Sequence, residues 1–168
     1  MKQKVFGITG WKNNGKTTMT VRLLEELRKR GYTVSSIKHA HHNFDIDHEN
    51  TDSWRHRQAG AQEVAIVSSS RWALIHELEN EEEPSLEIII SKMTPCDLIL
   101  VEGFKKNNHD KLEVRRVGGK IGEPISKLDK HIVAVASDKA EEESIPVFSL
   151  DDITAIATFI EGHMHLKI

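Results

Sequence analysis

The most constraining feature of this chain is the join between a short apolar run and a loop rich in glycine and lysine. Residues 5–9 (VFGIT) are mostly apolar, and residues 10–17 read GWKNNGKT. The spacing G-x-x-x-x-G-K-T is that of the phosphate-binding loop, which connects a buried strand to a helix. Apolar side chains at helical spacing predict that helix over residues 17–30. The start of the chain is therefore expected to form a strand–loop–helix unit.

The rest of the sequence alternates strand-like and helix-like segments. We predict strands at 33–38, 63–67, 72–76, 97–102, 112–116, 132–136 and 146–148, and helices at 53–59, 86–92 and 153–160. The runs 63–67 and 72–76 are close enough to form a β-hairpin. This alternation favours an α/β fold of the P-loop NTPase type. We expect a mostly parallel sheet with helices on both faces, a hairpin excursion around 63–78 and a single domain over 1–168.

Composition narrows the classes of partner. The 168 residues carry a net charge of −3, 38% hydrophobic residues and one cysteine, Cys96. The charge gives no reason to expect a nucleic-acid partner, which usually requires a basic face. No apolar stretch approaches the length of a membrane span, and an intrachain disulfide is impossible. We therefore expect a cytoplasmic protein that binds neither nucleic acid nor membrane.

The loop residues are assigned roles by the chemistry of phosphate binding. Gly15 lets the backbone approach phosphate oxygens, Lys16 would reach the β- and γ-phosphates, and the Thr17 hydroxyl would bind Mg²⁺. Backbone N–H groups at the positive end of the helix would complete the cradle. The full predicted phosphate site is Gly10, Asn13, Asn14, Gly15, Lys16, Thr17 and Thr18.

A carboxylate on a neighbouring strand is expected on the magnesium side. Glu102 ends the most apolar run of the chain, and ligands of open α/β sheets bind at the carboxyl ends of the strands. Asp97 begins the same run and would lie at the opposite edge. The sequence therefore favours Glu102 as the magnesium carboxylate.

Selection of the base is assigned to an aspartate. Guanine offers hydrogen-bond donors that a carboxylate accepts. The segment 126–129 (SKLD) looks like a degenerate guanine-binding motif, but it precedes a strand. Asp138 follows the strand 132–136 and so lies at the correct edge. We predict that Asp138 binds the base, against the alternative of a simple turn aspartate.

A histidine-rich loop follows the second strand. Residues 38–48 read KHAHHNFDIDH. One interpretation is metal storage or transfer, since histidine and aspartate are both metal ligands. A second is an ordinary polar loop. A third is that Asp45 or Asp47 meets Mg²⁺ through water while Lys38 and the histidines contact a phosphorylated second substrate.

Together these segments resemble one family, the nucleotide-binding protein B of molybdopterin-guanine dinucleotide biosynthesis. The similarity is carried by GWKNNGKTT, SIKHAHHNFDID, DSWRHRQAGA, RWALIHEL, DLILVEGFK and HIVAVASD, which span most of residues 4–138 in the expected order. The phosphate loop alone is unspecific, whereas KHxHH followed by DSWRHRQAGA is highly specific. The chain departs from the family at 49–52 (ENTD), where relatives commonly read P-G-K-D.

The resemblance implies a GTP-binding protein, dimeric and with weak GTPase activity at most. It would act as an adaptor for the guanylyltransferase that attaches GMP to molybdopterin, with GTP and Mg²⁺ as cofactors. By position, Glu102 belongs to the magnesium side. Lys38, His39, His41, His42 and Asp47 belong to the loop that faces the nucleotide or the molybdopterin. The hairpin around Trp72 is our candidate for the dimer contact.

A pure binding module with no turnover remains open from the residues, as do two other classes. One is a P-loop kinase or ligase acting on a small molecule, which would consume ATP rapidly once given its substrate. The other is a metal-insertion GTPase that loads a metal on the histidine loop. No residue is obviously placed to activate an attacking water, which favours slow hydrolysis and an accessory role.

Overall fold

The computed structural model describes residues 3–40, 44–120, 122–139 and 141–167. The chain groups into two compact units, of which the larger contains residues 1–39 and 90–168 and the smaller residues 40–89. None of the helices that the structure describes has the length and apolar character needed to span a bilayer.

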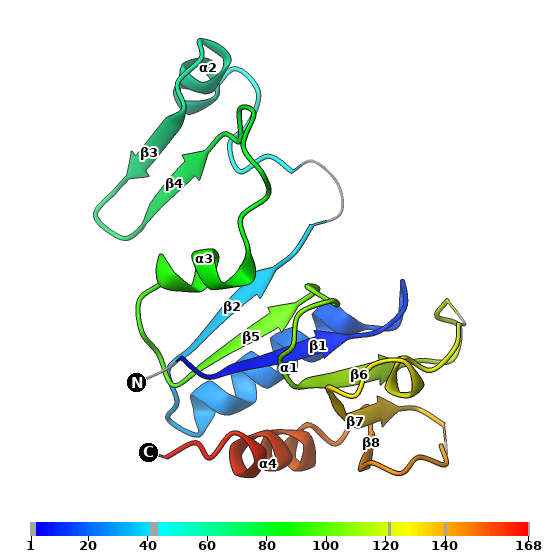
Figure 1. The fold of residues 1–168 in the computed structure, drawn as a ribbon. Helices are drawn as coiled ribbons and strands as arrows, with labels where there is room; N and C mark the ends of the chain where they lie inside the picture. Colours follow the sequence, from blue (N-terminus) through cyan, green and yellow to red (C-terminus); the bar gives the residue numbers. More distant parts are fainter. Residues whose placement is uncertain (1–2, 41–43, 121, 140, 168) are drawn as a thin grey trace. The chain divides into compact units, whose positions relative to one another are not determined.

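The larger unit is built on a six-stranded parallel sheet (Figure 1). Its strands are β1 (Val5–Thr9), β2 (Val34–Lys38), β5 (Leu98–Glu102), β6 (Lys111–Arg115), β7 (Ile132–Ser137) and β8 (Val147–Ser149). They lie in the order β2-β5-β1-β6-β7-β8, and every neighbouring pair is parallel. The expected parallel sheet is confirmed. Because all six strands are parallel, their carboxyl ends lie along one edge.

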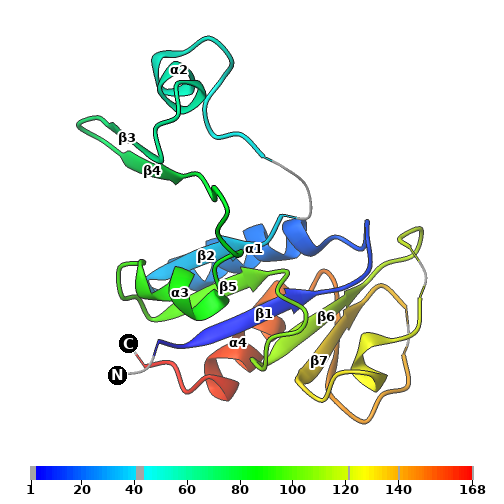
Figure 2. The same ribbon diagram turned by 45° about the horizontal axis from the view of Figure 1, so that its top comes forward.

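One face of the sheet packs against α1 (Lys16–Lys29) and α4 (Ile153–His163), which contact each other (Figures 1 and 2). Alternate strand residues point toward these helices, as the two-residue period of a strand requires. The core is made of fully buried aliphatic and aromatic side chains: Phe6, Ile8, Leu23, Leu27, Leu98, Leu100, Leu112, Ala134, Ala136, Ile156, Ala157 and Ile160. This core fixes the strand ends that carry the polar side chains. Helix α4 continues beyond its predicted end at residue 160 to His163.

On the opposite face of the sheet, β6 carries two charged side chains, Lys111 and Glu113, that are buried. Lys111 is 1% exposed, and its ammonium donates to the carbonyl of Asn107 (2.7 Å) and to Asp129 (2.9 Å). Glu113 is fully buried and accepts from the backbone N–H groups of Ile125 and Ser126, at the short 3₁₀ helix Ile125–Lys127. Asp129 thus lies beside the first residue of β6, at the edge opposite the carboxyl ends, as expected from its place before β7.

The smaller unit contains α2 (Asp52–Gln58) and the strands β3 (Glu63–Val67) and β4 (Trp72–His76). These strands pair antiparallel over their whole length, from Glu63 opposite His76 to Val67 opposite Trp72, so the predicted hairpin is confirmed. Val67 and Trp72 are 75% and 71% exposed. The remaining helix, α3 (Leu86–Ser91), spans the boundary between the units.

Candidate functional site

The loop after β1 takes backbone conformations that favour glycine. Gly10 has φ 149°, and a Cβ there would lie 2.4 Å from the Val114 carbonyl oxygen of β6. Gly15 has φ 88° and Asn13 has φ 65°, both in the left-handed region. Gly15 is also the residue that precedes α1, and no side chain caps this helix. Its first N–H groups are therefore available to an anion, as in other phosphate-binding loops.

A hollow opens over this loop. It is lined by Lys12, Asn13, Gly15, Lys16, Thr17, Thr18, Glu102 and Arg116. Five of the seven predicted phosphate residues thus line one space. The other two lie elsewhere: Gly10 packs against β6, and the buried side chain of Asn14 turns away to the segment that follows β6.

Lys16 is held within its own loop. Its ammonium donates to the Trp11 carbonyl at 2.9 Å. Burial, reinforced by repulsion from Lys105, lowers the pKa of Lys16, while Glu102 acts in the opposite direction. A partly desolvated ammonium gains more from a phosphate than one fully in water, because its charge is less screened. The loop therefore presents a cation ready for a polyphosphate.

Thr17 and Glu102 meet at this hollow. The Thr17 hydroxyl donates to Glu102 Oε1 at 2.9 Å. Sheet register explains the encounter, because Glu102 lies opposite Ile8 on β1 and opposite Lys38 on β2. The Lys38 ammonium is 4.0 Å from the same carboxylate oxygen. A hydroxyl beside a carboxylate is a donor set suited to Mg²⁺ and its waters. Asp97, by contrast, accepts from the Thr33 hydroxyl (2.6 Å) at the opposite end of β5.

A sharp turn follows Glu102. Gly103 has φ 104°, and a Cβ there would lie 2.7 Å from the Cβ of His39. The His39 ring stacks on Phe104 with centroids 4.5 Å apart, and the His39 N–H donates to the Glu102 carbonyl. Predicted residues Lys38 and His39 therefore lie beside the Glu102 end of β5. His41 and His42 lie outside the described residues.

A second hollow lies beside the first, at the ends of β6 and β7. Its lining includes Trp11, Asn14, Arg115, Arg116 and Asp138. Asp138 directly follows β7, and both of its carboxylate oxygens accept from the Val117 N–H, at 2.9 and 3.0 Å. Asp138, the base-binding candidate, is thus at the expected edge, and it lines the same hollow as Trp11 and Asn14 of the phosphate loop. Arg116 lines both hollows.

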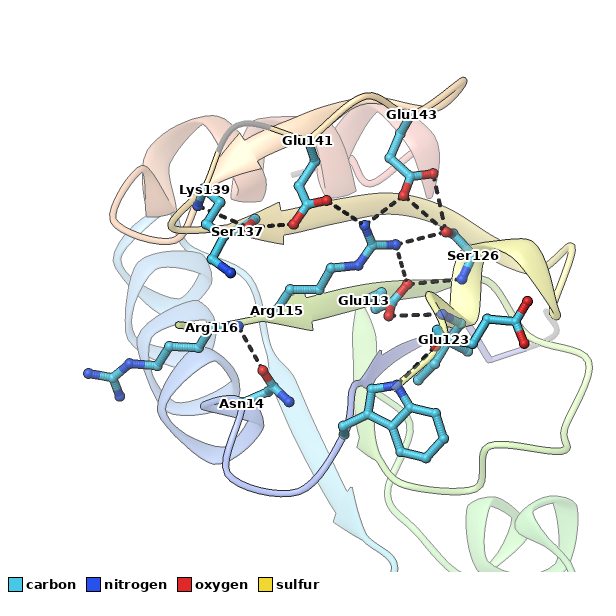
Figure 3. A network of polar contacts seen from close by, with 12 residues as sticks. Asn14, Glu113, Arg115, Arg116, Glu123, Ser126, Ser137, Lys139, Glu141 and Glu143 are labelled. Atoms are coloured by element: carbon cyan, nitrogen blue, oxygen red, sulfur yellow. Dashed lines mark hydrogen bonds and ion pairs between the residues drawn. The ribbon is translucent and has the colours of Figure 1, made fainter. Parts of the chain in front are cut away.

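The polar network of the second hollow centres on Arg115 (Figure 3). Its guanidinium binds Glu143 (2.6 Å), Glu113 (2.8 Å) and Glu141 (3.3 Å), and donates to the Ser126 hydroxyl (2.8 Å). Burial lowers the pKa of Arg115, but the hydrogen bonds with Glu113 and Glu143 outweigh burial and raise it above its usual value. The network fixes the end of β6 and the 3₁₀ helix to each other.

Asp47 has a partner other than a metal ion. In the smaller unit its carboxylate side chain is 2% exposed and binds Arg57 at 2.6 and 3.1 Å; Arg57 also contacts Asp45 and Glu77. The hydrogen bond from Arg57 lowers the pKa of Asp47 below its usual range. Within the ranges that the structure describes, no three or more His, Cys, Asp or Glu side chains gather as a metal site.

Sequence reasoning missed Arg115 and Arg116. Arg115 ends β6 and Arg116 follows it, so both lie at the carboxyl edge of the sheet, as Glu102 and Asp138 do. Carboxylates were sought at this edge for Mg²⁺ and for the base, so the two cations that end the predicted run 112–116 were passed over. An adjacent arginine pair at this edge was the available signal.

Comparisons with known proteins agree on one family. The family model described as molybdopterin guanine dinucleotide synthesis protein B matches residues 5–138. Two relatives are named molybdopterin-guanine dinucleotide biosynthesis adapter protein. The one from Haemophilus influenzae is 36% identical, with 96% of this chain and 89% of the relative covered. The one from Escherichia coli is 35% identical, with 93% and 90% covered.

A solved structure supports the same fold. The crystal structure titled molybdopterin-guanine biosynthesis protein B (mobB) aligns with a TM-score of 0.74 and 29% identity. It covers 96% of this chain and 99% of the solved one. The Bacillus subtilis MobB structure has the same TM-score at 24% identity, which supports the fold alone.

Proposed function

Because the chain belongs to the molybdopterin guanine dinucleotide synthesis protein B family, we propose that it is a GTP-binding adaptor of molybdenum cofactor biosynthesis. In this role it assists a guanylyltransferase that attaches GMP to molybdopterin. It binds GTP with Mg²⁺ and hydrolyses GTP weakly at most. The names of the relatives support the adaptor role, and the fold supports nucleotide binding.

The observation that carries the nucleotide site is the pairing of Thr17 with Glu102 beside Lys16. The 2.9 Å hydrogen bond puts a hydroxyl and a carboxylate next to an ammonium, over a helix start that no side chain caps. Phosphates would be held by Lys16 and the backbone N–H groups, and Mg²⁺ by Thr17 and Glu102. This is the arrangement that a nucleoside triphosphate with magnesium requires.

Guanine selection is assigned to Asp138. Its carboxylate already accepts from Val117 N–H and retains further acceptor capacity, since each oxygen has two lone pairs. In calorimetric titration with Mg²⁺, wild type should prefer GTP over ATP. Asp138→Ala should lose roughly tenfold in GTP affinity, the usual scale of a hydrogen bond to a charged group, and little in ATP affinity.

The matched control is Glu142→Ala, which removes one exposed carboxylate from the segment that follows Asp138. It should keep the GTP preference. A preference for ATP in wild type would move the kinase interpretation to first place. A GTP preference that survives Asp138→Ala would leave the function intact and remove Asp138 from the base site.

Asp47 gives a prediction that separates a structural role from magnesium binding. We expect Asp47→Asn to lower thermal stability, because Arg57 holds both carboxylate oxygens, and to leave the Mg²⁺ dependence of GTP binding unchanged. Since the folded-state pKa of Asp47 is lowered, its stabilisation is present at neutral pH and is lost as pH falls through that pKa. The stability difference between wild type and variant should therefore shrink at acidic pH. A change in the Mg²⁺ dependence of GTP binding in the variant would restore Asp47 as a ligand.

The proposed partners are the guanylyltransferase, molybdopterin and a second copy of the chain. Exposed Val67 and Trp72 on the hairpin support that surface as the dimer contact. Lys38 and His39, beside Glu102, support a contact between this edge and the molybdopterin phosphate. We place the protein in the cytoplasm, where GTP is available.

A further inference from the structure

We propose that Arg116 is a phosphate-binding residue, supplied to the nucleotide from the turn after β6. The inference rests on the proposed GTP site and adds a cation that the phosphate-loop motif does not contain. Arg116 lines the same hollow as Lys16, Thr17 and Glu102. Its side chain is exposed, and no hydrogen bond or ion pair of its guanidinium occurs within residues 3–40, 44–120, 122–139 and 141–167.

The two neighbouring arginines have different roles because Arg115 is the last residue of β6, whereas Arg116 begins the turn that follows it. Arg115 points into the second hollow, where three carboxylates neutralise it. Arg116 points away from that network, as Figure 3 shows. The Arg115 guanidinium already binds three carboxylates, whereas the Arg116 guanidinium has no such partner among the described residues and can bind an anionic ligand. Guanidinium matches phosphate oxygens in a two-pronged geometry.

The backbone of Arg116 is fixed to the phosphate loop. The Arg116 N–H donates to Asn14 Oδ1 at 2.7 Å, and Asn14 Nδ2 donates to the Lys120 carbonyl at 3.0 Å. The Lys120 N–H in turn donates to the Lys12 carbonyl at 2.9 Å. Asn14 is 4% exposed, and a Cβ on Gly119 would lie 2.4 Å from its Oδ1. This buried contact holds the turn, so only the arginine side chain has to move when phosphate binds.

The phosphate assignment competes with a base assignment, because Arg116 also lines the hollow of Asp138. Inorganic tripolyphosphate separates the two, since it carries phosphates and no base. Each compound is titrated against a fluorescent GTP analogue with Mg²⁺ bound to the full chain. The proteins compared are wild type, Arg116→Ala, Arg116→Lys and, as a control, Arg28→Ala. Arg28 is an exposed arginine in the last turn of α1, about 18 Å along the helix from Lys16.

Arg116→Ala should weaken the binding of GTP and of tripolyphosphate by a similar factor, about tenfold for the loss of a charge-assisted contact. Arg116→Lys should recover part of the loss, and Arg28→Ala should match wild type. Unchanged affinities in Arg116→Ala overturn the inference. A loss confined to GTP, with tripolyphosphate binding unchanged, also overturns it and moves Arg116 to the base. A wild type that does not bind GTP refutes the proposed function itself.

Discussion

Lys16→Ala should reduce GTP affinity at least a hundredfold, which corresponds to about 2.7 kcal/mol. Within the part of the chain that the structure describes, the Lys16 ammonium donates only to the Trp11 carbonyl, and its pKa is lowered by burial and by Lys105. A bound polyphosphate would replace a neutral acceptor with a charged one, in a place where water screens poorly. Removing the ammonium should therefore cost most of the phosphate attraction. Calorimetric titration with GTP and Mg²⁺ measures the loss.

Lys29→Ala is the matched control, since Lys29 is an exposed lysine at the far end of the same helix. It should bind GTP as wild type does. If, as proposed, the chain delivers GTP to a guanylyltransferase, the Lys16→Ala protein should also fail to stimulate that enzyme. Unaltered GTP affinity in Lys16→Ala would place the nucleotide elsewhere. Stimulation that persists without GTP binding would separate the adaptor role from the nucleotide.

The sequence could predict those site residues whose position depends on the loop motif or on the carboxyl edge of the sheet. The loop motif located Lys16 and Thr17, and the apolar run ending in Glu102 put that carboxylate at the carboxyl edge. Parallel register then brought Thr17 and Glu102 to 2.9 Å. The loop motif is a feature of local sequence. The position of Glu102 follows from the direction of parallel strands, without knowledge of their order.

The part that could not be predicted depends on which strands are neighbours. Asn14 binds a turn 102 residues away, and this contact exists because β6 lies next to β1. Alternation of strands and helices gives parallel strands, but it does not give their order. Asn14 was therefore assigned to phosphate by its place in the motif, although its side chain holds the turn after β6. Asp47 illustrates the same limit, since its partner Arg57 lies on a helix predicted without reference to it.

The second prediction with a large expected effect concerns the stability of an Arg115 variant. Its side chain is 13% exposed, and those of Glu113, Glu143 and Glu141 are 1%, 9% and 26% exposed. Arg115→Met fills similar space but leaves three carboxylates facing one another without a cation. Breaking a buried ion pair from one side costs about 3–5 kcal/mol, and we expect the free energy of unfolding of the larger unit to fall by that amount at pH 7. Urea unfolding followed by circular dichroism measures the change.

The neighbouring arginine provides the control that distinguishes pairing from simple loss of charge. Arg116→Ala removes the same formal charge from an exposed side chain, so its free energy of unfolding should stay within about 0.5 kcal/mol of wild type. The deficit of Arg115→Met should also shrink at acidic pH, because protonation of the carboxylates relieves their repulsion. Equal stability of the two variants would contradict this account. It would mean that the three carboxylates move apart into water when Arg115 is lost, so that the end of β6 does not depend on the network that surrounds it.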